Sequence, residues 1–263
     1  MSDMINENKH PGIEEIIECA RAAGKIAMSY YRSRHKIDVK NKLNDSDIVT
    51  IADKKCDEYI RNFISSNYPA HAILTEESGE TSGTEEWRWV VDPIDGTTNF
   101  FAGIPFWGIS IGLEKNGETV MGVFYMPATD ELFYAEKGKG AWLNDRRIHV
   151  SEQTHLSRSV ISTGFPVDKG TNPDNNLDNF AKIMPRVRDI RRLGSSAADM
   201  SYVAAGFLDA YWELNLHEWD INASTLILRE AGGVCTRFRQ DRGISVLCAN
   251  PDLHDQLLRL LNK

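Results

Sequence analysis

Apolar positions near the start of the chain recur at helical spacing. Between Ile13 and Ala27 they fall on one helical face, which predicts an amphipathic helix over residues 13–33. The polar, Lys-rich stretch at 35–46 predicts a loop or a flexible hairpin. A second amphipathic helix is expected to start at Asp53, where an aspartate is typical of an N-cap.

The pattern then changes to short apolar runs, some continuous and some alternating with polar positions. Asn-Gly and proline breaks separate the runs at 106–113, 120–125 and 132–135, which is typical of an antiparallel meander. The expected strands lie at 72–74, 89–91, 106–113, 120–125, 132–135 and 148–150.

Beyond residue 151, predicted strands and helices follow one another along the chain. The expected strands lie at 160–163, 188–192, 210–214, 234–238 and 244–249. The expected helices lie at 176–186, after Gly194, from Asp220 and from about 252. This order predicts an α/β half at residues 151–263 that packs on a more antiparallel α+β half at residues 1–150.

Composition restricts the class of protein. The 263 residues include 41% hydrophobic and 26% charged side chains, which is ordinary for a globular protein with a substantial core. The net charge of −8 argues against a surface that coats nucleic acid. Four cysteines without C-x-x-C spacing are expected to be reduced thiols of a cytoplasmic protein. The sequence shows no signal-peptide pattern and no apolar run of membrane-spanning length, so we expect neither a membrane nor a nucleic-acid partner.

The stretch WVVDPIDGTTNF at 89–100 carries the clearest candidate chemistry. Asp92 and Asp95 lie three residues apart where a short strand is expected to end, and Pro93 and Gly96 shape the following turn. Two hard oxygen ligands beside free backbone N–H groups suit a small dication that holds a phosphate. Asp-Pro and Asp-Gly are also common in ordinary surface turns, so these residues alone leave both interpretations open.

Two further stretches have a functional and a simpler interpretation. Glu76 and Glu77 stand side by side at a strand end, where a cation would relieve their repulsion, but a solvated loop would do so too. The segment 194–196 precedes an Ala-rich helix whose N-terminus could hold an anion. A serine N-cap without a ligand explains that segment equally well.

Three motifs in this order, TEES, WVVDPIDGTTNF and WDINASTLILREAGG, resemble the inositol monophosphatase family of Mg²⁺-dependent, Li⁺-sensitive phosphatases. The resemblance extends from about Ile13 to Leu261 and includes VTIAD and GSSAADMSYVAAG. It implies an α+β fold, a layered α-β-α-β-α sandwich of the inositol monophosphatase and fructose-1,6-bisphosphatase type, usually as a homodimer. The half at 1–150 would carry most metal ligands, and the half at 151–263 would carry Asp220 and the substrate contacts.

The resemblance also implies roles for individual residues. The metal ligands would be Glu76, Asp92, the carbonyl of Ile94, Asp95 and Asp220. The catalytic residues would be Asp53 with Thr97, which orient the attacking water, and Glu77 as a base beside the site. The substrate-binding residues would be Glu76, Ile94, Asp95, Gly96, Thr97, Gly194, Ser195, Ser196, Glu213 and Asp220. Lys42 matches a lysine of a loop near the metals.

The function implied is Mg²⁺-dependent hydrolysis of a phosphate monoester by activated water, with two or three ions in each active site. Hard carboxylate ligands that converge from separate elements suit Mg²⁺ and this reaction. The GTTN and WD sequences favour myo-inositol 1-phosphate. Fructose 1,6-bisphosphate, NADP, histidinol phosphate and 3′-phosphoadenosine 5′-phosphate stay open as substrates, and a regulatory binding protein on the same fold is the alternative without catalysis.

Three features depart from the family pattern or have no assigned role. Residues 237–243 are charged where relatives often have a Gly-rich turn. Glu218 adds a carboxylate close to Asp220, where it could be solvated or could alter the metal or substrate preference. Arg191 and Arg192 could reach a second phosphate, although a solvated strand end is the simpler role.

Overall fold

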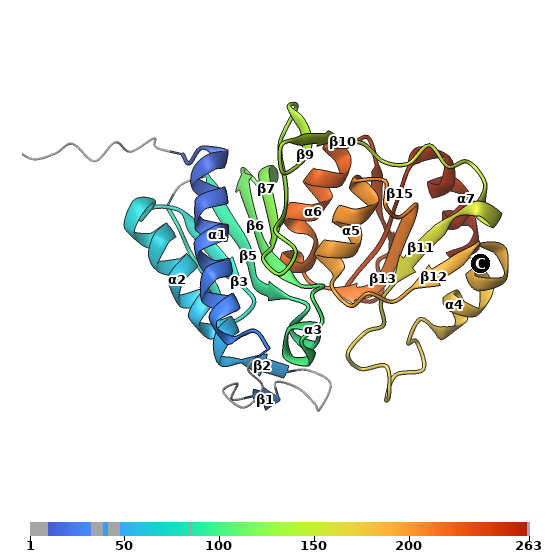
Figure 1. Cartoon of the computed structure of the whole chain (residues 1–263), viewed down its shortest axis with the longest axis horizontal. Helices are drawn as coiled ribbons and strands as arrows, with labels where there is room; N and C mark the ends of the chain where they lie inside the picture. Colours follow the sequence, from blue (N-terminus) through green and yellow to red (C-terminus); the bar gives the residue numbers. More distant parts are fainter. Residues whose placement is uncertain (1–9, 33–38, 42–47, 85, 262–263) are drawn as a thin grey trace, which may run out of the picture.

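The protein is a stack of five layers of secondary structure. The structure is a computed structural model that describes residues 10–32, 39–41, 48–84 and 86–261. Figure 1 shows the order helices, sheet, helices, sheet, helices from one side of the molecule to the other. The predicted α-β-α-β-α sandwich is therefore confirmed.

The first two layers are a helix pair and a large sheet. α1 (Ile13–Tyr30) and α2 (Ile51–Asn67) pack on each other and cover one face of the sheet. In spatial order its strands are β10 (Arg146–Ile148), β9 (Gly140–Leu143), β8 (Glu131–Glu136), β7 (Glu118–Met126), β6 (Gly108–Lys115), β5 (Trp87–Asp95), β3 (Ala72–Thr75) and β4 (Gly79–Thr81). Within the described part of this sheet only β3 and β5 pair in parallel, and β6, β7 and β8 follow one another antiparallel, so the predicted meander is confirmed.

The smaller sheet is mixed. In spatial order its strands are β12 (Asp189–Arg191), β11 (Val160–Thr163), β13 (Ala210–Leu216), β15 (Ile244–Ala249) and β14 (Val234–Arg239). β11 pairs in parallel with both β12 and β13, whereas β15 runs antiparallel to both its neighbours. The outer layer contains α4 (Leu177–Ile183) and α7 (Pro251–Leu261), and β1 (Val39–Asn41) with β2 (Ile48–Thr50) forms a separate ribbon.

The middle layer, α5 (Ser196–Ala204) and α6 (Glu218–Glu230), joins the two sheets into one core. α6 lies directly on β6 and β7, where Gly112 and Gly122 are cross-strand partners. A Cβ on Gly122 would lie 2.7 Å from the carbonyl oxygen of Ala223, and one on Gly112 would meet the side chain of Asn222. Because these positions have no side chain, α6 packs directly against the backbone of β6 and β7.

The boundary predicted near residue 151 lies between β10 and β11. Each sheet is built from one side of that boundary, but α5 and α6 belong to the second half and pack against the first. The division into two halves therefore describes the order of the chain, while the core is shared.

The predicted start of the second helix at Asp53 is wrong by two residues. α2 begins at Ile51, and its N-cap is Thr50, whose hydroxyl oxygen accepts hydrogen bonds from the N–H groups of Ala52 (3.1 Å) and Asp53 (3.4 Å). Asp53 instead returns a carboxylate oxygen to the N–H of Thr50 at 2.9 Å. Asp53 is the third residue of the helix and completes a capping box. In such a box the N-cap side chain accepts from the N–H of the third residue, and the side chain of the third residue accepts from the N–H of the N-cap.

The same error affects the start of α6. The helix begins at Glu218, not at Asp220, and its N-cap is His217. Asp220 accepts a hydrogen bond from the N–H of His217 at 2.7 Å, again from the third helical position. The sequence predicts both carboxylates at the helix start. In the structure each lies at the third helical position and accepts a hydrogen bond from the N–H of the N-cap residue.

The chain does not break at Asp92-Pro93 as expected. β5 continues to Asp95, with a register shift between Asp92, opposite Ser110, and Asp95, opposite Gly108. Such a bulge leaves a residue outside the hydrogen-bond ladder, so Pro93, which has no N–H, is tolerated there.

Smaller differences concern element ends. The first helix stops at Tyr30, the helix expected at 176–186 is α4 followed by a 3₁₀ turn (Met184–Arg186), and the strand expected at 148–150 is β10. A further 3₁₀ turn (Leu156–Arg158) precedes β11. In the described ranges, no helix combines the length and apolar character needed to cross a membrane.

Candidate functional site

The end of β5 meets the start of α5 at the centre of the molecule. Asp95 is 6% exposed, and one of its oxygens accepts hydrogen bonds from the hydroxyl of Ser195 and from the N–H of Ala197 (2.8 Å). Ser196 adds a longer bond of 3.4 Å to the other oxygen. The anion at the N-terminus of α5 is thus a carboxylate of the protein itself, held by N–H and hydroxyl donors as expected for a helix start.

Two glycines make this meeting possible. Gly96 and Gly194 have φ values of 88° and 94°, a region that side chains with a Cβ rarely adopt. A Cβ on Gly96 would lie 3.0 Å from the Cβ of Ser195. The backbone of α3 (Thr97–Ala102) can therefore start against the backbone that leads into α5.

Four of the predicted metal ligands form one electrostatic cluster. Asp92 is 2% exposed and accepts a hydrogen bond from the N–H of Ile94 at 3.0 Å. Burial raises the pKa of Asp92 well above its ordinary value, and the charges of Glu76, Asp95 and Asp220 raise this pKa further. Burial also raises the pKa of Asp95 to about 7, where the charges of Asp220 and Glu76 add to it and the Ser195 hydroxyl opposes it. The structure therefore brings together the carboxylates that sequence had placed on separate elements.

The donor set fits a hard divalent cation. All of its donors are oxygens, and mutual repulsion at a buried position is relieved when a cation neutralises it. A hydrogen bond with Glu76 adds to the rise in the pKa of Asp92, as expected where buried carboxylates crowd together without a counter-charge. Among the described residues, no group of three or more His, Cys, Asp or Glu side chains has the spacing of a ready metal-binding set.

The predicted catalytic pair is in contact. The Thr97 hydroxyl lies 3.2 Å from an oxygen of Asp53 and 3.1 Å from the carbonyl oxygen of Ile94. Asp53 is 1% exposed, and burial raises its pKa to about 7, against the hydrogen bonds from Thr50 and with the help of the charges of Glu77 and Glu76. Asp53 thus combines its capping role with a carboxylate that changes protonation near neutral pH.

A cavity of about 370 Å³ opens beside the cluster. Glu76, Asp220 and Glu213, three of the residues that the family resemblance assigns to substrate binding, line one part of it. Its other walls are Phe165, Pro166, Val167, Leu214, Asn215, Leu216, His217 and Trp219. The rings of His217 and Trp219 stack with centroids 4.8 Å apart. Sequence reasoning missed these two aromatic residues, whose only signal was their position next to Asp220.

Glu213 is half-buried in this wall. It accepts a hydrogen bond from the hydroxyl of Tyr211, and burial raises its pKa to about 7, while that hydrogen bond and the charge of Arg192 lower it. Gly164 lies so close that a Cβ there would overlap the Glu213 carboxylate. Of the two arginines considered from sequence, Arg192 acts on Glu213, whereas Arg191 pairs with Asp189 at 2.6 Å.

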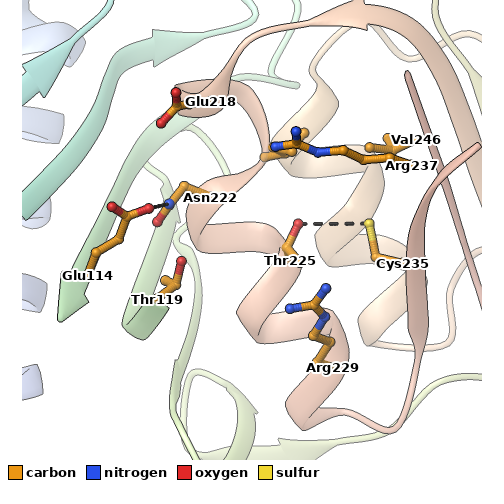
Figure 2. Close-up of a pocket in the computed structure, with 10 residues that line it drawn as sticks. Glu114, Thr119, Glu218, Asn222, Thr225, Arg229, Cys235, Arg237 and Val246 are labelled. Carbon is orange, nitrogen blue, oxygen red and sulfur yellow. Dashed lines mark hydrogen bonds between the residues drawn. The ribbon is translucent and has the colours of Figure 1, made fainter. Parts of the chain in front are cut away.

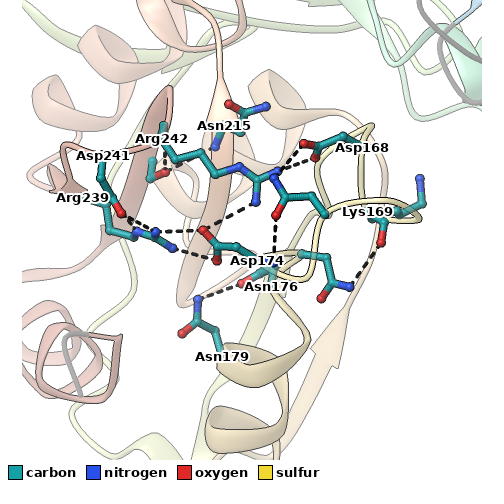
Figure 3. Close-up of polar contacts among 12 residues, drawn as sticks. Asp168, Lys169, Asp174, Asn176, Asn179, Asn215, Arg239, Asp241 and Arg242 are labelled. Atoms are coloured by element: carbon teal, nitrogen blue, oxygen red, sulfur yellow. Dashed lines mark hydrogen bonds and ion pairs between the residues drawn. The ribbon is translucent and has the colours of Figure 1, made fainter.

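The charged segment at 237–243 has a structural role. Arg239 binds Asp174 at 2.8 Å, and Arg242 binds Asp168 and lies 3.6 Å from Asp174. Figure 3 shows both guanidinium groups between the hairpin of β14 and β15 and the loop that carries these aspartates. The same loop begins with three residues of the cavity wall, at 165–167. The hairpin therefore holds the loop that shapes the cavity.

Glu218 does not join the carboxylate cluster. It pairs at 2.8 Å with Arg88, which also binds Glu114 at 3.1 Å and Glu80 at 3.0 Å. The suggestion that Glu218 alters the metal preference thus finds no contact in its favour. Lys42 lies outside the described residues.

A layered α+β sandwich with buried carboxylates where the end of β5 meets its middle helix layer is the fold class of the inositol monophosphatase and fructose-1,6-bisphosphatase type. The chain belongs to the inositol monophosphatase family, whose profile matches residues 8–263. The predicted family and fold type are thereby confirmed. Members of this family generally depend on metal ions.

Three relatives illustrate the similarity. The inositol-1-monophosphatase of Mesorhizobium japonicum is 39% identical over 254 residues, which cover 94% of this chain and 95% of that protein. The Nus factor SuhB of Escherichia coli K12 is 38% identical over 230 residues, covering 87% of this chain and 86% of that protein. The crystal structure of extragenic suppressor protein suhB from Bartonella henselae matches with a TM-score of 0.88 and 39% identity, over 95% of this chain and 98% of that one.

Proposed function

We propose that this protein is a phosphoric monoester hydrolase that converts myo-inositol 1-phosphate to inositol and phosphate. Family membership and relatives named inositol-1-monophosphatase support the activity. The structural observation that carries the proposal is the meeting of the carboxylate cluster, the hydrogen-bonded pair of Asp53 and Thr97, and the cavity lined by Glu213.

The cofactor proposed is Mg²⁺, with two or three ions in each site. Glu76, Asp92, Asp95, Asp220 and the carbonyl of Ile94 would hold them, since hard oxygen donors suit this ion. Such ions, when bound, lower the pKa of water and neutralise charge on the phosphate oxygens.

The protein's own part in the reaction is proton transfer and positioning. The Thr97 hydroxyl donates a hydrogen bond to Asp53 and can accept a hydrogen bond from a water molecule on its other side, which orients that water. Asp53, with its pKa of about 7, can take up the proton that the water gives away. Glu77 is close enough to raise that pKa and stays a candidate for a second base.

The inositol ring is assigned to the cavity beside Glu213. A carboxylate there accepts hydrogen bonds from vicinal hydroxyls, and the stacked His217 and Trp219 offer a flat wall. Ser195 and Ser196 already hold Asp95, which supports a positioning role for both. Direct contact of substrate with Gly96, Gly194 or these serines remains part of the proposal.

A second candidate substrate is fructose 1,6-bisphosphate, because Arg192 places a cation near Glu213 and Gly194. A second phosphate would need such a cation. The proposal further includes a homodimer that works in the cytoplasm, without a membrane or nucleic-acid partner. Size-exclusion chromatography with light scattering tests the dimer.

The test is phosphate release by metal-stripped protein to which Mg²⁺ is returned, with inositol 1-phosphate, fructose 1,6-bisphosphate and the three nucleotide or amino-alcohol phosphates compared by kcat/KM. We expect inositol 1-phosphate to be preferred and Asp220→Asn to abolish turnover. Arg192→Ala should reduce any bisphosphate activity, and Arg191→Ala is the matched control because Arg191 pairs elsewhere. A folded protein that releases no phosphate from any of these would overturn the proposal in favour of a binding protein.

A further inference from the structure

Two of the four cysteines face each other in the smaller sheet. Cys235 on β14 and Cys248 on β15 are direct cross-strand partners, and their sulfur atoms lie 3.1 Å apart. Directly opposed residues of antiparallel strands have Cα atoms about 4.5–5.5 Å apart. A disulfide requires about 4.4–6.8 Å, so the backbone can accept a bond between these two residues without being moved.

The two thiols differ in access. Cys235 is half-buried and lines a cavity of about 330 Å³ beside α6, whereas Cys248 is fully buried behind it. Figure 2 shows Cys235 on the wall of this cavity, in contact with the hydroxyl of Thr225, with Arg237 above the contact and Arg229 below it. A small reagent in the cavity would therefore meet Cys235 first.

The surroundings also separate the two thiols chemically. A hydrogen bond from Cys248 lowers the pKa of Cys235, and Thr225, Arg229 and Arg237 lower it further, against the effect of burial. Burial raises the pKa of Cys248. Because the thiolate is the nucleophile, Cys235 is suited to react first and Cys248 to react with the product.

We propose that Cys235 and Cys248 form a dithiol modification site that small hydroperoxides oxidise to an intrachain disulfide. The Cys235 thiolate attacks one peroxide oxygen, the O–O bond breaks, and a sulfenic acid and hydroxide form. The sulfur of Cys248 then attacks the sulfur of Cys235, the S–O bond breaks, and the Cys248 proton leaves with the hydroxyl group as water. Two thiols are oxidised and one peroxide is reduced.

The other two cysteines provide an internal control. Cys19 is 1% exposed and Cys56 is fully buried in the core under α1 and α2. Burial raises the pKa of Cys19 to about 12 and also raises the pKa of Cys56. Neither should react while the protein is folded. The site lies on the flank of α6 and uses no residue of the proposed hydrolysis, so it stands independently of the proposed function.

The experiment treats the reduced, full-length protein with hydrogen peroxide, blocks remaining thiols, and digests with trypsin. Each cysteine falls in a separate peptide, and those of the site span residues 230–237 and 243–259. We expect two of the four thiols to disappear, these two peptides to be linked, and dithiothreitol to release them. Linkage that involves Cys19 or Cys56, or that requires urea, would overturn the proposal, as would four intact thiols.

Two sets of variants separate the roles of the thiols. In Cys248→Ser, dimedone should trap a sulfenic acid on Cys235, while Cys235→Ser should leave all remaining thiols unreacted. Arg237→Ala should slow alkylation of Cys235 by iodoacetamide several-fold, and Arg237→Lys should restore most of the rate. Equal trapping at both cysteines, or alkylation that does not change in Arg237→Ala, would refute the assignment of Cys235 as the attacking thiol.

Discussion

Replacing Asp95 with asparagine should stabilise the metal-free protein and remove its response to Mg²⁺. Asparagine has the same shape, and its carbonyl oxygen can accept the hydrogen bonds that Ser195 and Ala197 donate to Asp95. What the substitution removes is one negative charge from a buried site where Asp220 and Glu76 repel it.

The size of the effect follows from the pKa of Asp95. Its rise from an ordinary 3.8 to about 7 is roughly three pKa units at about 1.4 kcal/mol each, so the charged form costs at most about 4 kcal/mol. Exchanging charge-assisted hydrogen bonds for neutral ones returns about 1 kcal/mol of that. We therefore expect Asp95→Asn to raise the free energy of unfolding by roughly 1–3 kcal/mol in EDTA at pH 8.

The sign also fixes a pH dependence. The folded state has the higher pKa, so it binds more protons than the unfolded state between pH 3.8 and about 7. The metal-free protein should therefore lose stability as pH rises through that interval, and the variant should lose less. With Mg²⁺ at a hundred times its dissociation constant the wild type should gain about 2.7 kcal/mol, and the variant little.

Urea denaturation with EDTA or with Mg²⁺, at pH 5.5 and pH 8, measures all of these quantities. Asp145→Asn, in an exposed turn, is the matched control and should change none of them. If Asp95→Asn is less stable than the wild type in EDTA at pH 8, the carboxylate acts mainly as a helix cap and the repulsion argument fails. If the variant keeps the full Mg²⁺ response, Asp95 is not a metal ligand.

Four further outcomes are expected. Glu213→Gln should lower kcat/KM for inositol 1-phosphate by a factor that corresponds to about 1–3 kcal/mol of activation free energy. A simple alkyl phosphate should be unaffected because only a polyol loses hydrogen bonds, and equal losses for both substrates would contradict this. Arg242→Ala should raise KM about tenfold with little change in kcat, because the loop of the cavity wall loses its anchor, and Arg242→Lys should recover part of it. With Mg²⁺ at saturation, turnover should rise with pH as Asp53 ionises, with the midpoint below the metal-free pKa of about 7 because the ions offset the charge of Glu76, and Asp53→Asn should abolish that limb of the pH profile. Li⁺ should inhibit uncompetitively against substrate, and a rate unchanged by high Li⁺ would indicate a different second metal site.

Sequence predicted the elements better than their ends. The spacing of Thr50 and Asp53, three residues apart, is the signature of a capping box, whereas an aspartate considered alone predicts a simple N-cap. The strand that continues through Pro93 depends on a bulge, which local propensity does not reveal.

Long-range contacts account for what sequence could not supply. Asp95 and Ser195 are a hundred residues apart, and no local pattern shows that the carboxylate of one element occupies the start of another helix. The sequence marks the charged segment around Arg242 as a departure from the family pattern but does not show its partners. Those partners, Asp168 and Asp174, lie about seventy residues earlier in the chain. By contrast, Asp53 and Thr97 meet as the family resemblance implied.

The glycine pair beneath α6 has a consequence for how the protein can change over evolution. Gly112 and Gly122 let the helix rest on the backbone of the sheet, so side-chain volume does not set the distance between these two layers. Substitutions elsewhere in the core can then exchange bulk without lifting the helix. The position of Asp220 relative to the carboxylates of β5 then depends little on the size of the core residues around it. It depends instead on Gly112 and Gly122, where almost any substitution would displace the helix.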